Sequence, residues 1–161
     1  MKNKKLKILF LYPNLNMSTL VPNAISILTA ILKQAGFNNI DLFDTTFYES
    51  DGLSKDEDRV KVGQVQPFNF DERNIKLKRT DMYKDFINKV NKFKPDIIFF
   101  GHVDRLNYLD LLKIKENYKN IKIAQWFIDP LVKLGPDYKK NKERFYLKYQ
   151  FADANFLTTS P

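Results

Sequence analysis

The sequence predicts an α/β protein with a doubly wound parallel sheet of about five strands, Rossmann-like, in the flavodoxin-like order 2-1-3-4-5. Short continuous apolar runs, typical of strands covered on both faces, alternate with amphipathic segments of helical period. The chain has 161 residues and a hydrophobic content of 43%, which suffices for one domain with its own core. A right-handed βαβ unit followed by a reversal beyond the first strand gives the stated order.

The first βαβ unit is predicted from three consecutive segments. Residues 7–12, KILFLY, form a continuous apolar run that ends at a proline, as expected of a buried strand. The following helix, over residues 22–35, begins with proline and stops at Gly36. Its apolar residues fall on one face: Ile25, Leu28, Ile31 and Leu32. Residues 39–43, NIDLF, then form the second strand.

The pattern dissolves over residues 45–78, a stretch too long for a plain connection in a compact domain and therefore expected to be functional. Thr80 is expected to cap a helix over residues 80–92. Its inward residues are Met82, Phe86, Ile87, Val90 and Phe93. The remaining strands are expected at 95–100, 121–127 and 154–158, and the remaining helices at 106–118 and 136–151.

Composition excludes several classes of protein. The chain contains no cysteine, which excludes disulfides, thiolate zinc sites, thiolate-ligated iron–sulfur clusters and cysteine nucleophiles. No run approaches the roughly 18 apolar residues of a membrane-spanning helix. The basic start and short apolar run lack a small-residue cleavage site, so they indicate a first strand rather than a signal peptide. We expect a cytoplasmic protein.

The net charge of +8 raises the possibility of an anionic partner. Lysine supplies most of it and is spread along the chain. The densest basic cluster lies in and before the last predicted helix, where Asp137 and Glu143 are mixed in: Lys133, Lys139, Lys140, Lys142, Arg144 and Lys148. This pattern favours a solvated helix surface over a nucleic-acid groove. Nucleic acid is therefore not an expected partner.

In doubly wound sheets, ligands bind outside the carboxyl ends of the strands, where the strand order reverses. The search therefore concentrates on the segments that follow the strands: 13–21, 44–45 and beyond, 101–105, 129–130 and 158–161. The first of these contains no glycine, which excludes a dinucleotide fingerprint and a P-loop because both need glycine for close backbone approach to phosphate.

Several residues in these segments have two interpretations. His102, beside Asp104, is suited to be a general base, but a structural or ligand-edge histidine is favoured, and one histidine makes a poor metal site. Asp44 either accepts a hydrogen bond from a ribose hydroxyl or caps a turn. Asp129 likewise fits either turn geometry or ligand contact. The rings of the last predicted helix are expected in the core: Tyr138, Phe145, Tyr149 and Phe151.

The first hundred residues resemble the amino-terminal cobalamin-binding domain of radical S-adenosylmethionine enzymes. The matching segments are KILFLYPN, the proline-led helix ending in LKQAG, LFDTTFY, GQVQPFNF with KLKRTDMYKDFINKV, and KFKPDIIFF. The resemblance implies a cobalamin cofactor whose corrin ring lies over the strand ends and whose nucleotide tail can enter the sheet beside the first and third strands. The implied contact residues are Pro13, Asn14, Ser18, Thr19, Leu20, Asp44, Thr45, Gly101, His102 and Val103.

The chain departs from that family at several points. The Asp-x-His-x-x-Gly motif that supplies a cobalt-ligating histidine is absent, so His102 is not expected to be the lower axial ligand. Trp126 and Phe127 stand where a small glycine pair often ends the fourth strand, and at least one ring should crowd the channel for the tail. Without cysteine, the chain carries no radical cluster. The resemblance therefore implies a module without catalytic or metal-ligating residues, whose partner is a separate catalytic or other downstream domain.

The last sixty residues resemble a different family, the amino-terminal half of GT-B glycosyltransferases of the spore-coat type. The matching segments are GHVDRL, LLKIKENYKNIKIAQWFIDP and DANFLTTSP. This second resemblance implies an acceptor-side domain whose sugar donor is held by a further domain. Both families share a Rossmann-like architecture, so the predicted fold is the same. We expect a single domain over residues 1–161 that is a module of a larger protein.

Overall fold

The computed structural model describes residues 4–12, 23–45, 48, 81–101, 106–127, 129, 131–135 and 137–157. Five parallel strands form one sheet in the order β2-β1-β3-β4-β5. The strands are β1 (Lys4–Tyr12), β2 (Phe37–Asp44), β3 (Ile97–Gly101), β4 (Lys122–Phe127) and β5 (Ala154–Leu157). The described helices are α1 (Asn23–Gln34), α3 (Met82–Phe93), α4 (Tyr108–Asn117) and α5 (Tyr138–Tyr149). The predicted fold class and strand order are confirmed.

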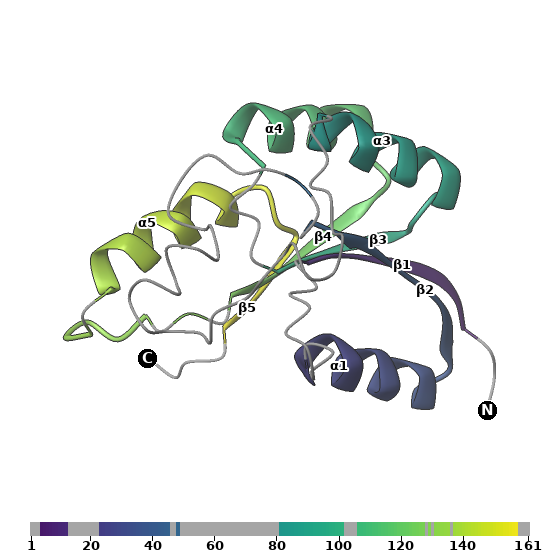
Figure 1. The fold of residues 1–161 in the computed structure, drawn as a ribbon, viewed down its shortest axis with the longest axis horizontal. Helices are drawn as coiled ribbons and strands as arrows, with labels where there is room; N and C mark the ends of the chain where they lie inside the picture. Colours follow the sequence, from purple (N-terminus) through teal and green to yellow (C-terminus); the bar gives the residue numbers. More distant parts are fainter. Residues whose placement is uncertain are drawn as a thin grey trace, which may run out of the picture.

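The helices are divided unequally between the two faces of the sheet. In Figure 1, α1 lies on one face, while α3 and α4 lie on the other. Helix α5 shares the face of α3 and α4, because its Phe145 packs edge-on against Phe127 of β4 at 5.5 Å. Right-handed crossovers produce this division, since the chain steps from β1 to β2 in one direction and from β2 through β5 in the other. We refer to the two sides as the α1 face and the α3 face.

The core consists of two clusters separated by the sheet. On the α3 face, Leu9 and Leu11 of β1 meet Phe86 and Val90 of α3, with Ile98 of β3. On the α1 face, the buried cluster is Ile8, Phe10, Tyr12 and Ile25. The alternation along β1 between these clusters is the period of two expected of a strand that is buried on both faces.

Ile31 belongs to the apolar face predicted for α1 but is exposed, and the prediction that Tyr149 lies in the core is wrong. Ile31 of α1 is 54% exposed, because α1 has only the β1–β2 side of the sheet to pack against and Leu28 and Leu32 already occupy it. Tyr149 of α5 is 47% exposed, because it lies on a flank of the helix that no described element covers. The inward residues predicted for α3 are confirmed: Met82, Phe86, Ile87, Val90 and Phe93.

Local signals set the ends of the helices. Asp81, rather than the predicted Thr80, caps α3 by accepting hydrogen bonds from the backbone N–H groups of Tyr83 and Lys84. Asn107 and Asp110 form a reciprocal capping box at the start of α4. Helix α1 ends at Gly36, whose φ of 92° lies in the left-handed region that glycine adopts without steric cost. The observed element bounds lie within about three residues of the predicted ones.

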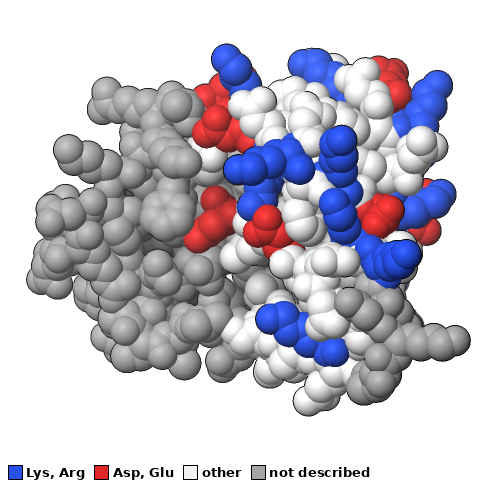
Figure 2. Space-filling view, turned by 90° about the vertical axis from the view of Figure 1, so that its right-hand side faces the viewer, with Lys and Arg blue, Asp and Glu red and all other residues white. Residues whose placement is uncertain are grey.

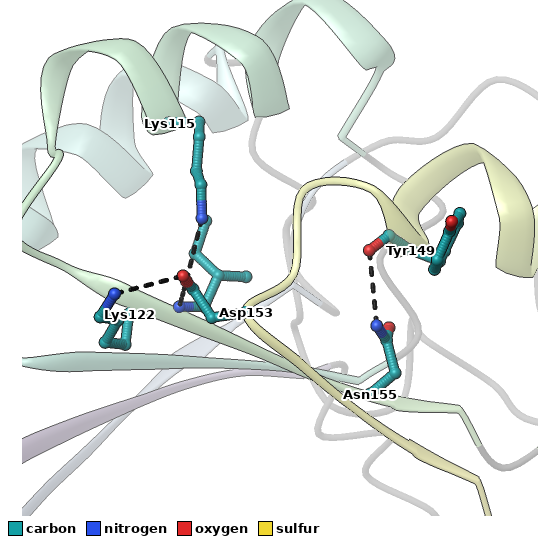
Figure 3. Close-up of polar contacts among 6 residues, drawn as sticks. Lys115, Lys122, Tyr149, Asp153 and Asn155 are labelled. Atoms are coloured by element: carbon teal, nitrogen blue, oxygen red, sulfur yellow. Dashed lines mark hydrogen bonds and ion pairs between the residues drawn. The ribbon is translucent and has the colours of Figure 1, made fainter.

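The strands begin at one edge of the sheet, which we call the amino edge. Acidic side chains form hydrogen bonds and ion pairs that hold the loops there. The Asp96 carboxylate accepts a 2.7 Å hydrogen bond from the backbone N–H of Lys7. Asp153 accepts one of 2.8 Å from the backbone of Ile123 and is paired with Lys115 and Lys122 (Figure 3). These contacts lower the pKa of Asp153 to about 2, the backbone hydrogen bond being the largest cause.

The amino edge is rich in lysine. Figure 2 looks at this end of the molecule, where lysine and arginine side chains are interspersed with acidic ones. Basic residues occupy the last turns of all four described helices: Lys33, Lys92, Lys115 and Lys148. Cations are stabilised there by the partial negative charge of the helix carboxyl end. These four lysines therefore have a structural role.

None of the described helices has the length and apolar character needed to cross a membrane. The predicted long connection over residues 45–78 falls almost entirely outside the described residues, of which it includes only Thr45 and Tyr48.

Candidate functional site

The carboxyl ends of the strands bring five residues into one row on the α1 face. Tyr12 is in register with Asp44 on one side, and its neighbour Leu11 is in register with Phe100, which places Tyr12 beside Gly101. Gly101 is in turn in register with Trp126, and Trp126 with Phe156. In strand order, this carboxyl row reads Asp44, Tyr12, Gly101, Trp126 and Phe156. It crosses the point between β1 and β3 at which the strand order reverses, where doubly wound sheets bind ligands.

Gly101 is required by the ring of Tyr12. A Cβ atom at position 101 would lie 2.5 Å from Cδ2 and 2.8 Å from Cε2 of Tyr12, closer than side-chain carbons approach each other. Tyr12 itself is only 8% exposed. The ring therefore fills the space above Gly101, and the groove between β1 and β3 is closed on the α1 face.

The opposite row, on the α3 face, changes from apolar to polar along the sheet. Phe43, Leu11 and Phe100 are buried, whereas the next positions are Gln125 and Asn155. Gln125 is 3% exposed, yet neither its Nε2 nor its Oε1 has a hydrogen-bond partner in the described part of the chain. Sequence reasoning missed this residue, although a glutamine inside the apolar run IAQWF was a signal for it.

The segment after β2 is fastened to helix α3. Thr45 donates its backbone N–H to the carbonyl of Tyr12 at 3.3 Å and is buried. Tyr48 stacks on Phe43 at 5.6 Å and donates its hydroxyl to the Asp85 carboxylate at 3.0 Å. Burial first, and then this hydrogen bond, raises the pKa of Tyr48 to about 12. Tyr48 therefore stays neutral at physiological pH and serves as an anchor, not as an acid.

The residues after β4 are held by an ion pair. Arg144 of α5 donates to the Asp129 carboxylate at 2.7 Å and to Asn141 Oδ1 at 3.3 Å, and its guanidinium lies 5.7 Å from the ring centre of Phe127. Of the two interpretations that the sequence leaves open for Asp129, this geometry supports a structural one. Trp126 and Phe127 face opposite sides of the sheet, as the sequence predicts, and Phe127 faces α5.

Three of the predicted site residues lie within the described chain, and the structure brings them together. Asp44 and Gly101 flank Tyr12 in the carboxyl row, and Thr45 is bonded to the carbonyl of Tyr12. The other predicted residues lie outside the described residues: Pro13, Asn14, Ser18, Thr19, Leu20, His102 and Val103.

The described residues restrict how a corrinoid could bind at this edge. A nucleotide tail inserted between β1 and β3 on the α1 face would meet the ring of Tyr12, which occupies the space above Gly101. The edge itself presents a carboxylate at Asp44 and aromatic side chains at Tyr12 and Trp126. Among the residues described, no three histidine, cysteine, aspartate or glutamate side chains lie close enough to hold a metal ion.

Comparisons with known proteins leave the function to be argued from the site. No protein family, curated protein or solved structure matches this chain.

Proposed function

We propose that the chain is a corrinoid-binding module that holds the corrin ring against the carboxyl ends of β1, β2 and β3. The observation that carries the proposal is the reversal of strand order between β1 and β3, with Asp44, Thr45 and Gly101 at that edge. Asp44 supplies an acceptor for amide or hydroxyl donors of a ligand. The module itself has no catalytic residues and acts with a separate catalytic domain, of the radical S-adenosylmethionine type, in the cytoplasm.

In this proposal the nucleotide tail stays outside the sheet. The reason is that the Tyr12 ring fills the space above Gly101 and would have to rotate away before a tail could enter there. Tyr12, on the α1 face, is therefore the ring that limits the depth of binding, and Phe127, on the other face, does not limit it.

A titration with hydroxocobalamin, followed by visible absorbance, tests the proposal. The folded chain should change the corrinoid spectrum, and Tyr12→Ala should keep or tighten the binding because it opens the groove. The same substitution should lower the melting temperature, since trimming a buried aromatic ring costs about 3 to 5 kcal/mol. Tyr12→Phe is the matched control and should retain both properties. His102→Ala should leave the spectrum of the bound corrinoid unchanged.

One observation favours a second candidate function, the acceptor-side domain of a GT-B glycosyltransferase. The Tyr12 ring fills the space over Gly101 that an inserted nucleotide tail of a corrinoid would need, whereas an acceptor-side domain needs no such space. If the well-folded chain leaves the hydroxocobalamin spectrum unchanged at high concentration, the corrinoid proposal is wrong. Joining a downstream nucleotide-binding domain should then produce binding of a nucleotide sugar.

A further inference from the structure

Helix α5 carries a stripe of three tyrosines and a lysine along one flank. Tyr138, Lys142, Tyr146 and Tyr149 are spaced by four, four and three residues, which places them on one side of a helix. The side-chain contacts agree with this placement. The Lys142 ammonium lies 5.8 Å from the ring centres of both Tyr138 and Tyr146, and the rings of Tyr146 and Tyr149 meet edge-on at 5.6 Å. We call these four residues the tyrosine stripe.

The stripe is open to solvent. Tyr146 is 54% and Tyr149 47% exposed. Within the described segments, no hydrogen bond or ion pair holds the hydroxyls of Tyr146 and Tyr149 or the ammonium of Lys142. The main chain beneath is fixed, because Asn155 of β5 donates to the carbonyl of Tyr149 at 3.4 Å (Figure 3). Tyr149 stacks with one side of its ring on Phe145 at 6.0 Å, and the half-exposed rings leave their other sides to solvent.

The charge on the same helix is strongly positive. Helix α5 has five cationic residues and a single acidic one, Glu143. Lys139 is exposed on the flank next to the stripe, whereas Lys140, although exposed, lies on the opposite side of the helix. Arg144 and Lys148 face the sheet and Lys140 lies on the far side of the helix, so Lys139 and Lys142 are the cations available to a partner that covers the stripe. These like charges also oppose the docking of a second copy of α5 against the first.

We propose that the tyrosine stripe of α5, with Lys139, binds single-stranded nucleic acid without sequence preference. Exposed rings interleaved with cations are what such binding requires, because bases stack on aromatic side chains while lysines neutralise the phosphates. Twelve residues of helix give a platform about 18 Å long, enough for a few nucleotides. The sequence alone favours a solvated helix surface here over a nucleic-acid site. The half-exposed tyrosine rings are the observation that favours the nucleic-acid site instead. The proposal is independent of corrinoid binding.

Fluorescence anisotropy of the intact chain with a fluorescein-labelled oligothymidylate of about 15 nucleotides tests the proposal. Tyr146→Ala and Tyr149→Ala should each weaken binding about tenfold, whereas the corresponding Phe variants should stay within about twofold, because they keep the stacking face. Lys142→Gln should weaken binding more than Lys119→Gln, a matched control at an exposed lysine beyond α4. With two phosphates neutralised, by Lys139 and Lys142, log K should fall against log salt concentration with a slope of about −1.4.

Circular dichroism melting confirms that each variant is folded. Two results would overturn the proposal. The first is binding that the alanine variants leave unchanged or that a duplex of the same length competes for equally, since both indicate charge attraction alone. The second is the absence of binding to the oligonucleotide at low salt. If an acidic polyglutamate peptide binds in its place, the stripe is assigned to an acidic protein partner.

Discussion

The side-chain amide of Gln125 lies in the core between Phe100 and Asn155, and neither its nitrogen nor its oxygen is hydrogen-bonded within the described part of the chain. Leaving a buried polar group unpaired costs about 1 to 3 kcal/mol. An apolar residue of the same size would suit the fold better, since Phe100 and Ile123 on the same face are buried. Gln125 is thus a residue that the packing of the sheet does not explain.

Replacing Gln125 should stabilise the protein. Gln125→Met keeps the length of the side chain and removes the unpaired amide, so the free energy of unfolding should rise by about 1 to 2 kcal/mol. For a domain of this size the melting temperature should rise by about 2 to 4 °C per kcal/mol. Gln125→Glu is the control and should destabilise, because it introduces a buried charge. A lower melting temperature for Gln125→Met would show that the amide has a partner.

Asp153 should make stability depend on acid pH. Its pKa is lowered to about 2 in the folded protein, so its contribution is fully present above the ordinary aspartate pKa and is lost as the pH falls through about 2. Because Asp153 is partly exposed, solvent screening keeps this contribution to about 1 to 2 kcal/mol. Urea unfolding of the parent and Asp153→Asn between neutral and acid pH measures it. The difference in unfolding free energy should shrink with acidification, and a constant difference would contradict the assignment.

At the scale of the element, the period of the apolar residues and the end of α1 at Gly36 were readable from the sequence, whereas the residue that caps α3 was not. The inward face of α3 follows from its period, but Asp81, one residue after Thr80, makes the cap, because either residue type can cap and only the backbone geometry decides. The exposure of Ile31 and Tyr149 was not readable. A helical period shows which residues share a face, whereas tertiary packing decides how much of that face is covered.

Helix α3 ends in a strained residue that can be improved. Lys94 has φ 53° and ψ 64°, in the left-handed region, while its N–H donates to the carbonyl of Val90 at 2.7 Å. This conformation costs an L-residue about 1 to 2 kcal/mol, and glycine avoids it at some cost in chain entropy. Lys94→Gly should therefore stabilise by about 0.5 to 1 kcal/mol, whereas Lys92→Gly, within the helix, should destabilise by about 1 kcal/mol. Melting temperatures of both variants check this, and two decreases would contradict it.

At the scale of the whole molecule, the fold follows from the alternation of apolar runs with helical segments, and the strand order follows from crossover handedness. The site was predictable only as a location. Asp44 and Gly101 lie on either side of Tyr12 because parallel strands end at the same edge of a sheet. The packing of the Tyr12 ring over Gly101, in contrast, depends on the volumes of the side chains in the folded protein. The unpaired amide of Gln125 likewise depends on what surrounds it. The apolar run around Gln125 indicates that its side chain is buried, but no local pattern in the sequence shows that the amide is unpaired or that Tyr12 packs over Gly101.

The most direct test of the proposed ligand edge is a map of backbone amide chemical shifts by NMR during a titration with hydroxocobalamin. The amides of Asp44, Thr45 and Gly101, at the carboxyl edge, should shift on binding. Those of Lys7 and Lys122, at the amino edge, should not. Shifts centred on the amino edge, or no shifts in a well-folded sample, would contradict the account.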